Sequence, residues 1–194
     1  MRCTGGADVS PSISADEFEE LYRATARDVL AYARRRTAGD TDDLVAEVYA
    51  VAWRRRADLP APPLRRAWLF GVARVLLKET ARRQRRDGEL VGELAARREP
   101  PLEAPGEPAG ADRTAAVVTA ALARLAPNDR EALQLVAWEG LTPAELAVAL
   151  GVRPGAARVR LHRARRALAR DPHVQALVDE PGSPVTSTAD VRST

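Results

Sequence analysis

The chain has 194 residues, with 30 basic and 27 acidic side chains and a single cysteine. This length suggests one or two small domains, and a lone Cys3 excludes a disulfide framework and a cysteine-based zinc site. No apolar run approaches the roughly 18 residues of a membrane span, and the first residues lack a signal-peptide core. We therefore expect a soluble cytoplasmic protein without membrane insertion. The two histidines, His162 and His173, are too few and too poorly placed for a metal site, and we expect no cofactor.

The N-terminal part of the chain predicts a disordered segment followed by an amphipathic helix. Residues 1–13 are small and polar, which is typical of a disordered tail. Ser14 then opens a helix, with Glu17 in the capping-box position. The apolar stripe of this helix is Phe18, Leu21, Tyr22, Val29, Leu30 and Ala33. Gly39 ends it.

A second helix is predicted from about Thr41 to Arg56, and it carries acidic residues on its outer face. Its apolar side consists of Leu44, Val45, Val48, Tyr49, Ala52 and Trp53. Asp43 and Glu47 lie on the other side. Three prolines at positions 60, 62 and 63 then predict a stiff loop.

The third helix is predicted over about residues 64–86 and ends in the basic run ARRQRR. Its inward side is Trp68, Leu69, Val72, Ala73 and Leu76. Three such helices can close a small bundle. We therefore predict an N-terminal domain over residues 14–87.

Residues 88–112 differ from what precedes them, because they are acidic and contain several prolines and glycines. This composition predicts a flexible linker. Helical periodicity then resumes at 115–125 and 128–139, so we predict a four-helix C-terminal domain over 113–170. Residues 171–194 are polar and are expected to form a disordered tail. No strand pattern occurs, and the fold class predicted is all-α.

The stretch 141–170 reads as a helix-turn-helix. Thr142, Pro143 and Glu145 predict the start of a short helix, and Gly151 predicts its end. A second helix begins near Pro154, and it carries Arg158, Arg160, Arg163, Arg165, Arg166 and Arg170. An arginine-rich helix can also be a solvated surface. No acidic residue lies within this helix to neutralise its charge, however, which favours binding to an external anion such as DNA.

Three blocks carry a resemblance to a known family: residues 43–55, 67–86 and 122–168. In this order and with a linker between them, they resemble the extracytoplasmic-function (ECF) sigma factors. These are the compact class of sigma-70-type subunits that direct bacterial RNA polymerase to promoters. The resemblance implies three partners, namely core RNA polymerase, promoter DNA and an anti-sigma factor. It implies a sigma region 2-like domain, a linker and a sigma region 4-like domain, and no enzymatic activity.

The resemblance also implies roles for individual residues. Contacts with core polymerase are implied for Asp43, Glu47, Tyr49 and Trp53. Contacts with the −10 element and its backbone are implied for Trp68, Arg74, Val75, Lys78, Arg82, Arg83, Arg85 and Arg86. Contacts with the −35 element are implied for Arg153, Arg158, Val159, His162, Arg163 and Arg166.

Three positions depart from the family pattern. Val75 stands where the family usually has an asparagine that helps hold a flipped −10 base, and Ala46 stands where it usually has glutamine. Arg153 replaces the usual serine or threonine at the start of the recognition helix, and it is a poor side-chain cap. Since valine offers no hydrogen bond, base reading at Val75 is expected to be weaker.

The alternatives to a sigma factor are a helix-turn-helix regulator and an enzyme. A helix-turn-helix regulator that does not bind polymerase stoichiometrically would share the basic second helix. An enzyme would need a glycine-rich phosphate loop or a nucleophile–histidine or carboxylate–metal constellation, and the sequence contains no plausible one. The order of the three blocks favours the sigma factor.

Overall fold

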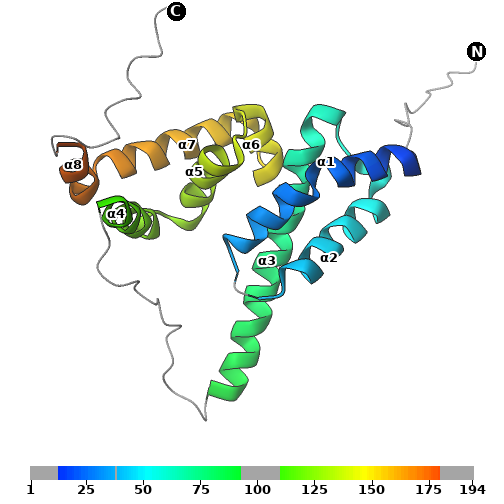
Figure 1. Cartoon of the computed structure of the whole chain (residues 1–194), viewed down its shortest axis with the longest axis horizontal. Coiled ribbons are helices and arrows are strands. Elements are labelled where there is room, and N and C mark those ends of the chain that lie inside the picture. The colour runs from blue at the N-terminus through cyan, green and yellow to red at the C-terminus, as the bar shows by residue number, and fades with distance from the viewer. Residues whose placement is uncertain (1–12, 38, 93–109, 180–194) are drawn as a thin grey trace, which may run out of the picture. The chain divides into compact units, whose positions relative to one another are not determined.

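The computed structural model of the chain describes residues 13–37, 39–92 and 110–179, and their side chains except those of 87–92 and 110–112. Within these ranges it contains eight α-helices, one short 3-10 helix and no strand, which confirms the all-α fold. The helices are α1 (Ala15–Arg34), α2 (Thr41–Arg54), α3 (Pro62–Gly92), α4 (Gly110–Arg124), α5 (Pro127–Glu139), α6 (Pro143–Leu150), α7 (Pro154–Ala169) and α8 (Pro172–Asp179), with η1 at Arg56–Asp58 (Figure 1). None of these helices is long and apolar enough to cross a membrane.

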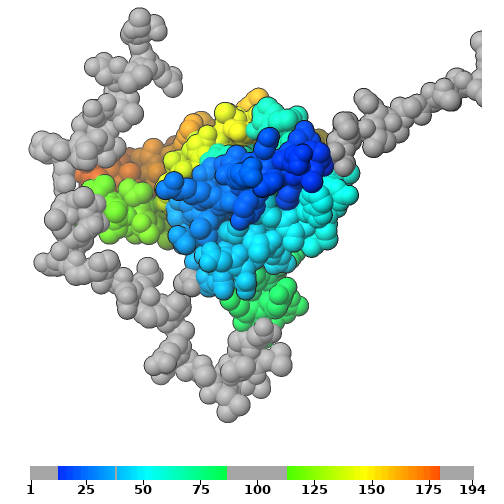
Figure 2. Space-filling model, turned by 45° about the vertical axis from the view of Figure 1, so that its right-hand side comes forward, coloured from blue at the N-terminus to red at the C-terminus, as the bar shows by residue number. Residues whose placement is uncertain are grey.

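The first compact unit contains α1, α2 and α3, and α6 is grouped with them. Its interior consists of fully buried residues on the facing sides of the three long helices: Val29, Tyr32, Ala33, Val48, Ala52, Leu69, Phe70 and Ala73. The rings of Tyr32 and Phe70 lie 5.2 Å apart. On the face drawn in Figure 2, α1 and α2 form one continuous surface over this interior. Phe70 was missing from the predicted inward side of its helix, whereas Trp68 and Val72 are only partly buried.

Helix α1 begins as the sequence predicted. The Ser14 hydroxyl accepts a hydrogen bond from the Glu17 amide at 3.2 Å, and the Glu17 carboxylate accepts one from the Ser14 amide at 2.9 Å. This reciprocal pair is the capping box, and it satisfies two amides that the helix leaves without partners. Ile13, just before the cap, is only 5% exposed, so the predicted disordered tail is wrong at this residue. The rest of that tail lies outside the described residues.

Helix α6 is grouped with the first unit, although the predicted domain 113–170 includes its sequence. A close approach of its C-terminal end to α3 explains the grouping. A Cβ atom at Gly71 would lie 3.1 Å from the Ala149 carbonyl oxygen, so only glycine leaves ordinary space there. The Arg74 guanidinium also donates to the Leu150 carbonyl at 2.9 Å. This bond satisfies one of the carbonyls that end a helix without a partner.

The second unit contains α4, α5, α7 and α8. Leu122 and Leu125 of α4 pack with Ala164 of α7 in its core, and Leu133 and Leu168 pack against them. Arg130 of α5 donates to the Ala123 carbonyl at 2.7 Å, which supports the end of α4. The predicted linker 88–112 is shorter than expected, because α3 continues to Gly92 and α4 begins at Gly110. Its remaining residues, 93–109, lie outside the described ranges.

Helix α8 corrects the prediction of a loose tail from residue 171. The Asp171 carboxylate caps the helix by accepting bonds from the His173 amide at 3.0 Å and the Val174 amide at 3.4 Å. Pro172 occupies the first helical position, where a missing N–H costs nothing. Leu177 is buried. The sequence reading overlooked this Asp-Pro start because the surrounding residues are polar; residues 180–194 lie outside the described part.

The turn between α6 and α7 has the geometry that the sequence predicted. Gly151 has a φ of +64°, in the left-handed region that favours glycine. Its amide donates to the Val148 carbonyl at 3.0 Å, and the Val152 amide donates to the Ala147 carbonyl at 3.0 Å. These two bonds are the Schellman pattern that terminates a helix. Arg153 precedes α7 and makes no side-chain capping bond, as expected for arginine.

Candidate nucleic-acid and polymerase-binding surfaces

The outward side of α7 is basic. The helix buries Ala157, Leu161 and Ala164, at steps of four and three residues. On the remaining surface the exposed predicted residues are Arg153, Arg158, Val159, His162, Arg163 and Arg166. Val159 is 61% exposed, which leaves its methyl groups accessible to another molecule. This side therefore offers positive charge together with one apolar contact, the combination that a DNA major groove accepts.

Arg163 differs from its neighbours because it already has a partner. Its Nε donates to Asp129 Oδ2 at 2.7 Å, and its Nη2 donates to Oδ1 at 2.8 Å. Asp129 lies in the first turn of α5, and its side chain is only 8% exposed. The hydrogen bonds from Arg163 hold the pKa of this carboxyl below its usual value, and the same bonds raise the pKa of the guanidinium. Sequence reasoning missed Asp129, since nothing in the local pattern shows which helix it faces.

The C-terminal half of α3 presents a second basic surface. Lys78, Arg82, Arg83, Arg85 and Arg86 are all exposed. Val75, one turn before Lys78, is 46% exposed and therefore belongs to the surface of the helix. Guanidinium and ammonium groups spaced along a helix suit phosphate contacts, which add affinity without reading sequence.

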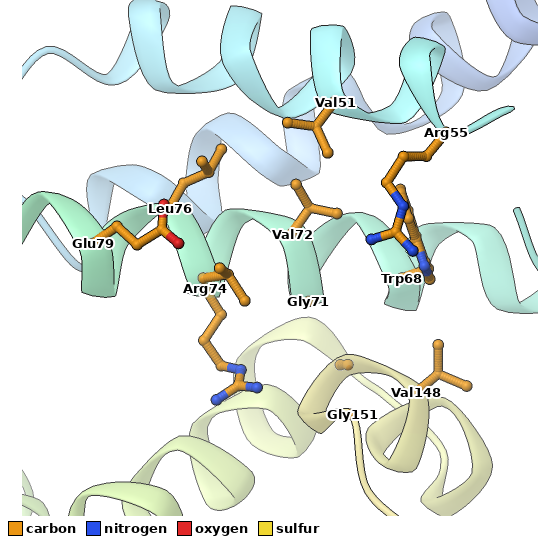
Figure 3. A pocket seen from close by; sticks show the side chains of 12 residues that line it. Val51, Arg55, Trp68, Gly71, Val72, Arg74, Leu76, Glu79, Val148 and Gly151 are labelled. Carbon is orange, nitrogen blue, oxygen red and sulfur yellow. The ribbon is translucent and has the colours of Figure 1, made fainter. Parts of the chain in front are cut away.

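Trp68, Arg74 and Val75 line one cavity of about 410 Å³ (Figure 3). Apolar side chains from α2 and α3, including Val51, Val72 and Leu76, form much of its wall. The structure thus brings together three of the predicted −10 residues, while the arginines at 82–86 follow further along α3. The Arg74 side chain donates to the Leu150 carbonyl, and its buried Nε has no hydrogen-bond partner among the described residues.

Of the four predicted polymerase-binding residues on α2, three are exposed and one is buried. Asp43 and Glu47 are exposed and lie one turn apart. Trp53 is 40% exposed, with its ring 5.0 Å from that of Phe18 and the Arg56 guanidinium 4.8 Å from its centroid. Tyr49, in contrast, is 6% exposed.

The Tyr49 hydroxyl lies 2.8 Å from the Thr25 hydroxyl on α1. Burial raises the pKa of Tyr49 to about 12. Tyr49 therefore supports the α2 surface from inside, whereas Asp43, Glu47 and Trp53 form it. Thr25 and Phe18, which hold the two aromatic side chains, were not singled out as functional from the sequence.

No cluster of three or more potential metal ligands occurs among the residues that the structure describes. The geometry contains two basic helical surfaces and one acidic and aromatic surface. Binding to nucleic acid and to protein is what such surfaces can do.

Comparisons with known proteins agree with this arrangement. Residues 116–168 match the family model described as Sigma-70, region 4. The ECF RNA polymerase sigma factor SigL of Mycobacterium tuberculosis is 34% identical over 170 residues, which covers 84% of this chain and 93% of that protein.

Two solved structures are also similar to this chain. One is the sigma factor RpoE in complex with the anti-sigma factor NepR from Bartonella quintana, with a TM-score of 0.57 and 20% identity over 79% of this chain and 95% of that one. The other is CnrH in complex with the cytosolic domain of CnrY, with a TM-score of 0.50 and 23% identity over 86% and 90% of the two chains. At these identities both share a fold with this chain.

Proposed function

The chain belongs to the ECF family of RNA polymerase sigma factors, and we propose that its three surfaces divide the work of promoter-specific initiation among them. The exposed side of α2 binds core polymerase, α3 contacts the −10 element and α7 reads the −35 element. The proposed role is binding, with no catalytic step of its own, in the cytoplasm where core polymerase acts. The exposed basic side of α7 carries this proposal.

The assignment of α7 to base reading rests on chemistry. An arginine paired to the edge of a guanine is the commonest specific contact in the major groove. Arg158 and His162 are exposed near the N-terminal half of α7, the part of a recognition helix that contacts bases. Exposed Val159 between them can contact a thymine methyl group. Arg166 lies further along and suits a phosphate.

The assignment of α3 to the −10 element separates backbone contacts from base contacts. Lys78, Arg82, Arg83, Arg85 and Arg86 supply phosphate contacts. Trp68 and Val75 border the cavity of α3 and supply apolar contact to bases. Arg74 contributes a positive charge beside them.

The domain assignment is also proposed: residues 14–87 as the region 2-like domain, 113–170 as the region 4-like domain and 88–112 as the linker. The family-model match over residues 116–168 supports the second of these. We further propose that an anti-sigma factor controls the protein, because RpoE, which shares its fold, is found in such a complex.

Co-purification with core RNA polymerase tests the proposal. Tagged full-length chain should retain core polymerase at a one-to-one ratio, and Glu47→Lys should lower the affinity about tenfold, because it places a positive charge on the acidic side of α2. Asp179→Lys, an equal charge change on exposed α8, should have no effect. Failure of the wild-type chain to retain polymerase would overturn the proposal. Equal losses in both variants would show only nonspecific charge dependence and would remove α2 from the docking surface.

A further inference from the structure

Arg163 and Asp129 of α5 form an ion pair on α7, the helix that we propose reads the −35 element. We propose that Arg163 is a positioning residue that sets the rotation of α7 on α5 through Asp129, and that it does not read a base. This inference rests on the proposed role of α7 in binding the −35 element. It removes one arginine from the set of base readers and adds Asp129, on another helix, to the residues that determine DNA affinity.

The first argument is that Asp129 requires this partner. Its side chain is 8% exposed, and both carboxylate oxygens accept bonds from Arg163. A carboxylate so withdrawn from water is unfavourable unless it is paired. Moving Arg163 to a base edge would leave Asp129 as an unpaired anion under α7. Arg158 and Arg166 are also exposed, but the bonds to both Asp129 oxygens come from Arg163.

The second argument concerns the packing of α7. The helix buries two alanines and one leucine, Ala157, Ala164 and Leu161, against the rest of its unit. Leu168 adds a partly buried apolar contact, and apolar contacts of this kind are non-directional. A bidentate arginine–carboxylate pair has a fixed planar geometry and defines the rotation of α7 on α5.

A second ion pair lies at the C-terminal end of α7, and both of its bonds end on one carboxylate oxygen. Arg124 of α4 donates from Nε at 2.9 Å and from Nη2 at 2.6 Å to Asp171 Oδ2, and Asp171 comes just after α7. The side chain of Asp171 is 10% exposed. The two pairs therefore hold α7 at two points, one near its middle and one at its end. Its orientation against α4 and α5 then follows from charge pairing as well as from apolar contact.

The test uses full-length variants in holoenzyme with core polymerase. The probes are duplexes that carry the upstream element selected by the wild-type holoenzyme from a random pool, together with every single-base-pair change in it. Arg163→Ala should weaken binding to all duplexes by a similar factor, about tenfold, and leave their ranking unchanged. Asp129→Asn should give the same uniform loss, and the double variant should be no worse than either single one, because both remove one interaction.

Two controls make the outcome specific. Arg158→Ala should instead lose about 5- to 150-fold discrimination at one base pair, as expected for a base reader. Arg163→Lys, which keeps the charge but not the planar fork, should recover part of the lost affinity. Affinities are measured well below the melting temperature of every variant, so that a pair that contributes only to folding stability would leave them unchanged.

Each possible result either supports or overturns the positioning role proposed for Arg163. Loss of preference at one base pair in Arg163→Ala would make Arg163 a base reader and overturn the proposal, whether or not Asp129→Asn does the same. Unchanged affinity in both variants at low temperature would also overturn it. If the wild-type holoenzyme shows no upstream preference, the proposed role of α7 fails instead, and the pairing is still tested by the coupling of the two substitutions in thermal unfolding.

Discussion

Tyr49 of α2 and Thr25 of α1 share a buried hydrogen bond of 2.8 Å between their hydroxyl oxygens. The Thr25 hydroxyl also donates to the Leu21 carbonyl at 2.6 Å. Because threonine has a single hydroxyl proton, the Tyr49 hydroxyl is the donor in the bond to Thr25. The bond therefore requires Tyr49 to be neutral. It joins α2, the helix that we propose binds polymerase, to α1.

This bond predicts a loss of stability in strong alkali. The pKa of Tyr49 is raised to about 12 in the folded chain, from an ordinary value of 10.0. The Tyr49 hydroxyl therefore loses its proton at a lower pH in the unfolded chain than in the folded chain. The stabilisation from this difference is fully present below pH 10 and is lost as the pH rises towards 12. We expect the free energy of unfolding to fall by about 2 kcal/mol across this range. Urea unfolding at several pH values measures it, and Tyr49→Phe should show a shallower decline. Equal declines in both proteins would contradict the prediction.

Val75→Asn tests the departure of this chain from its family. Val75 is 46% exposed, so asparagine can be accommodated at the surface, and the free energy of unfolding should change by less than about 1 kcal/mol. The new amide can form hydrogen bonds with a base that valine cannot, so preference within the −10 element should sharpen. Transcription from a set of −10 variants measures this change. Val178→Asn, the same change at a valine 44% exposed on α8, serves as the control. Equal −10 preference in wild type and Val75→Asn would exclude a base contact at this position.

Arg158 and Arg166 should behave differently although both are exposed on α7. Arg158→Ala should cost about 1–3 kcal/mol on the preferred −35 sequence and little on a scrambled one, because it removes a base contact. Arg166→Ala should weaken both sequences equally and reduce the salt dependence of binding by about one unit, because it removes a phosphate contact. Binding at several salt concentrations separates the two effects. A sequence-selective loss in both variants would contradict this division of α7.

The predicted linker should be the first site of limited proteolysis. Its prolines, glycines and acidic residues indicate few buried contacts. Glutamyl endopeptidase should therefore cut at Glu93 or Glu103, neither of which precedes a proline, before it cuts at Glu47 within α2. Mass spectrometry of the early fragments identifies the site. First cleavage inside a helical domain would contradict the two-domain assignment.

The sequence alone determined the local features of this protein. Apolar periodicity located most of the helices, Ser14 and Glu17 predicted the start of α1, and Gly151 predicted the turn before α7. These features were predictable because helix periodicity, capping and left-handed turns depend on residues within a few positions of one another.

Only the tertiary structure decided which of the similar residues are available for contact. Arg158 and Arg163 look equivalent in sequence, yet only Arg163 reaches a buried aspartate 34 residues away. Tyr49 and Trp53 share one apolar stripe, yet Tyr49 is buried while Trp53 remains 40% exposed. Periodicity shows which side of a helix is apolar, but not where a neighbouring helix crosses it or which charge that neighbour brings within hydrogen-bond distance. Those two properties arise from packing between distant segments, and they separate a residue that can contact DNA or polymerase from one that holds the surface in place.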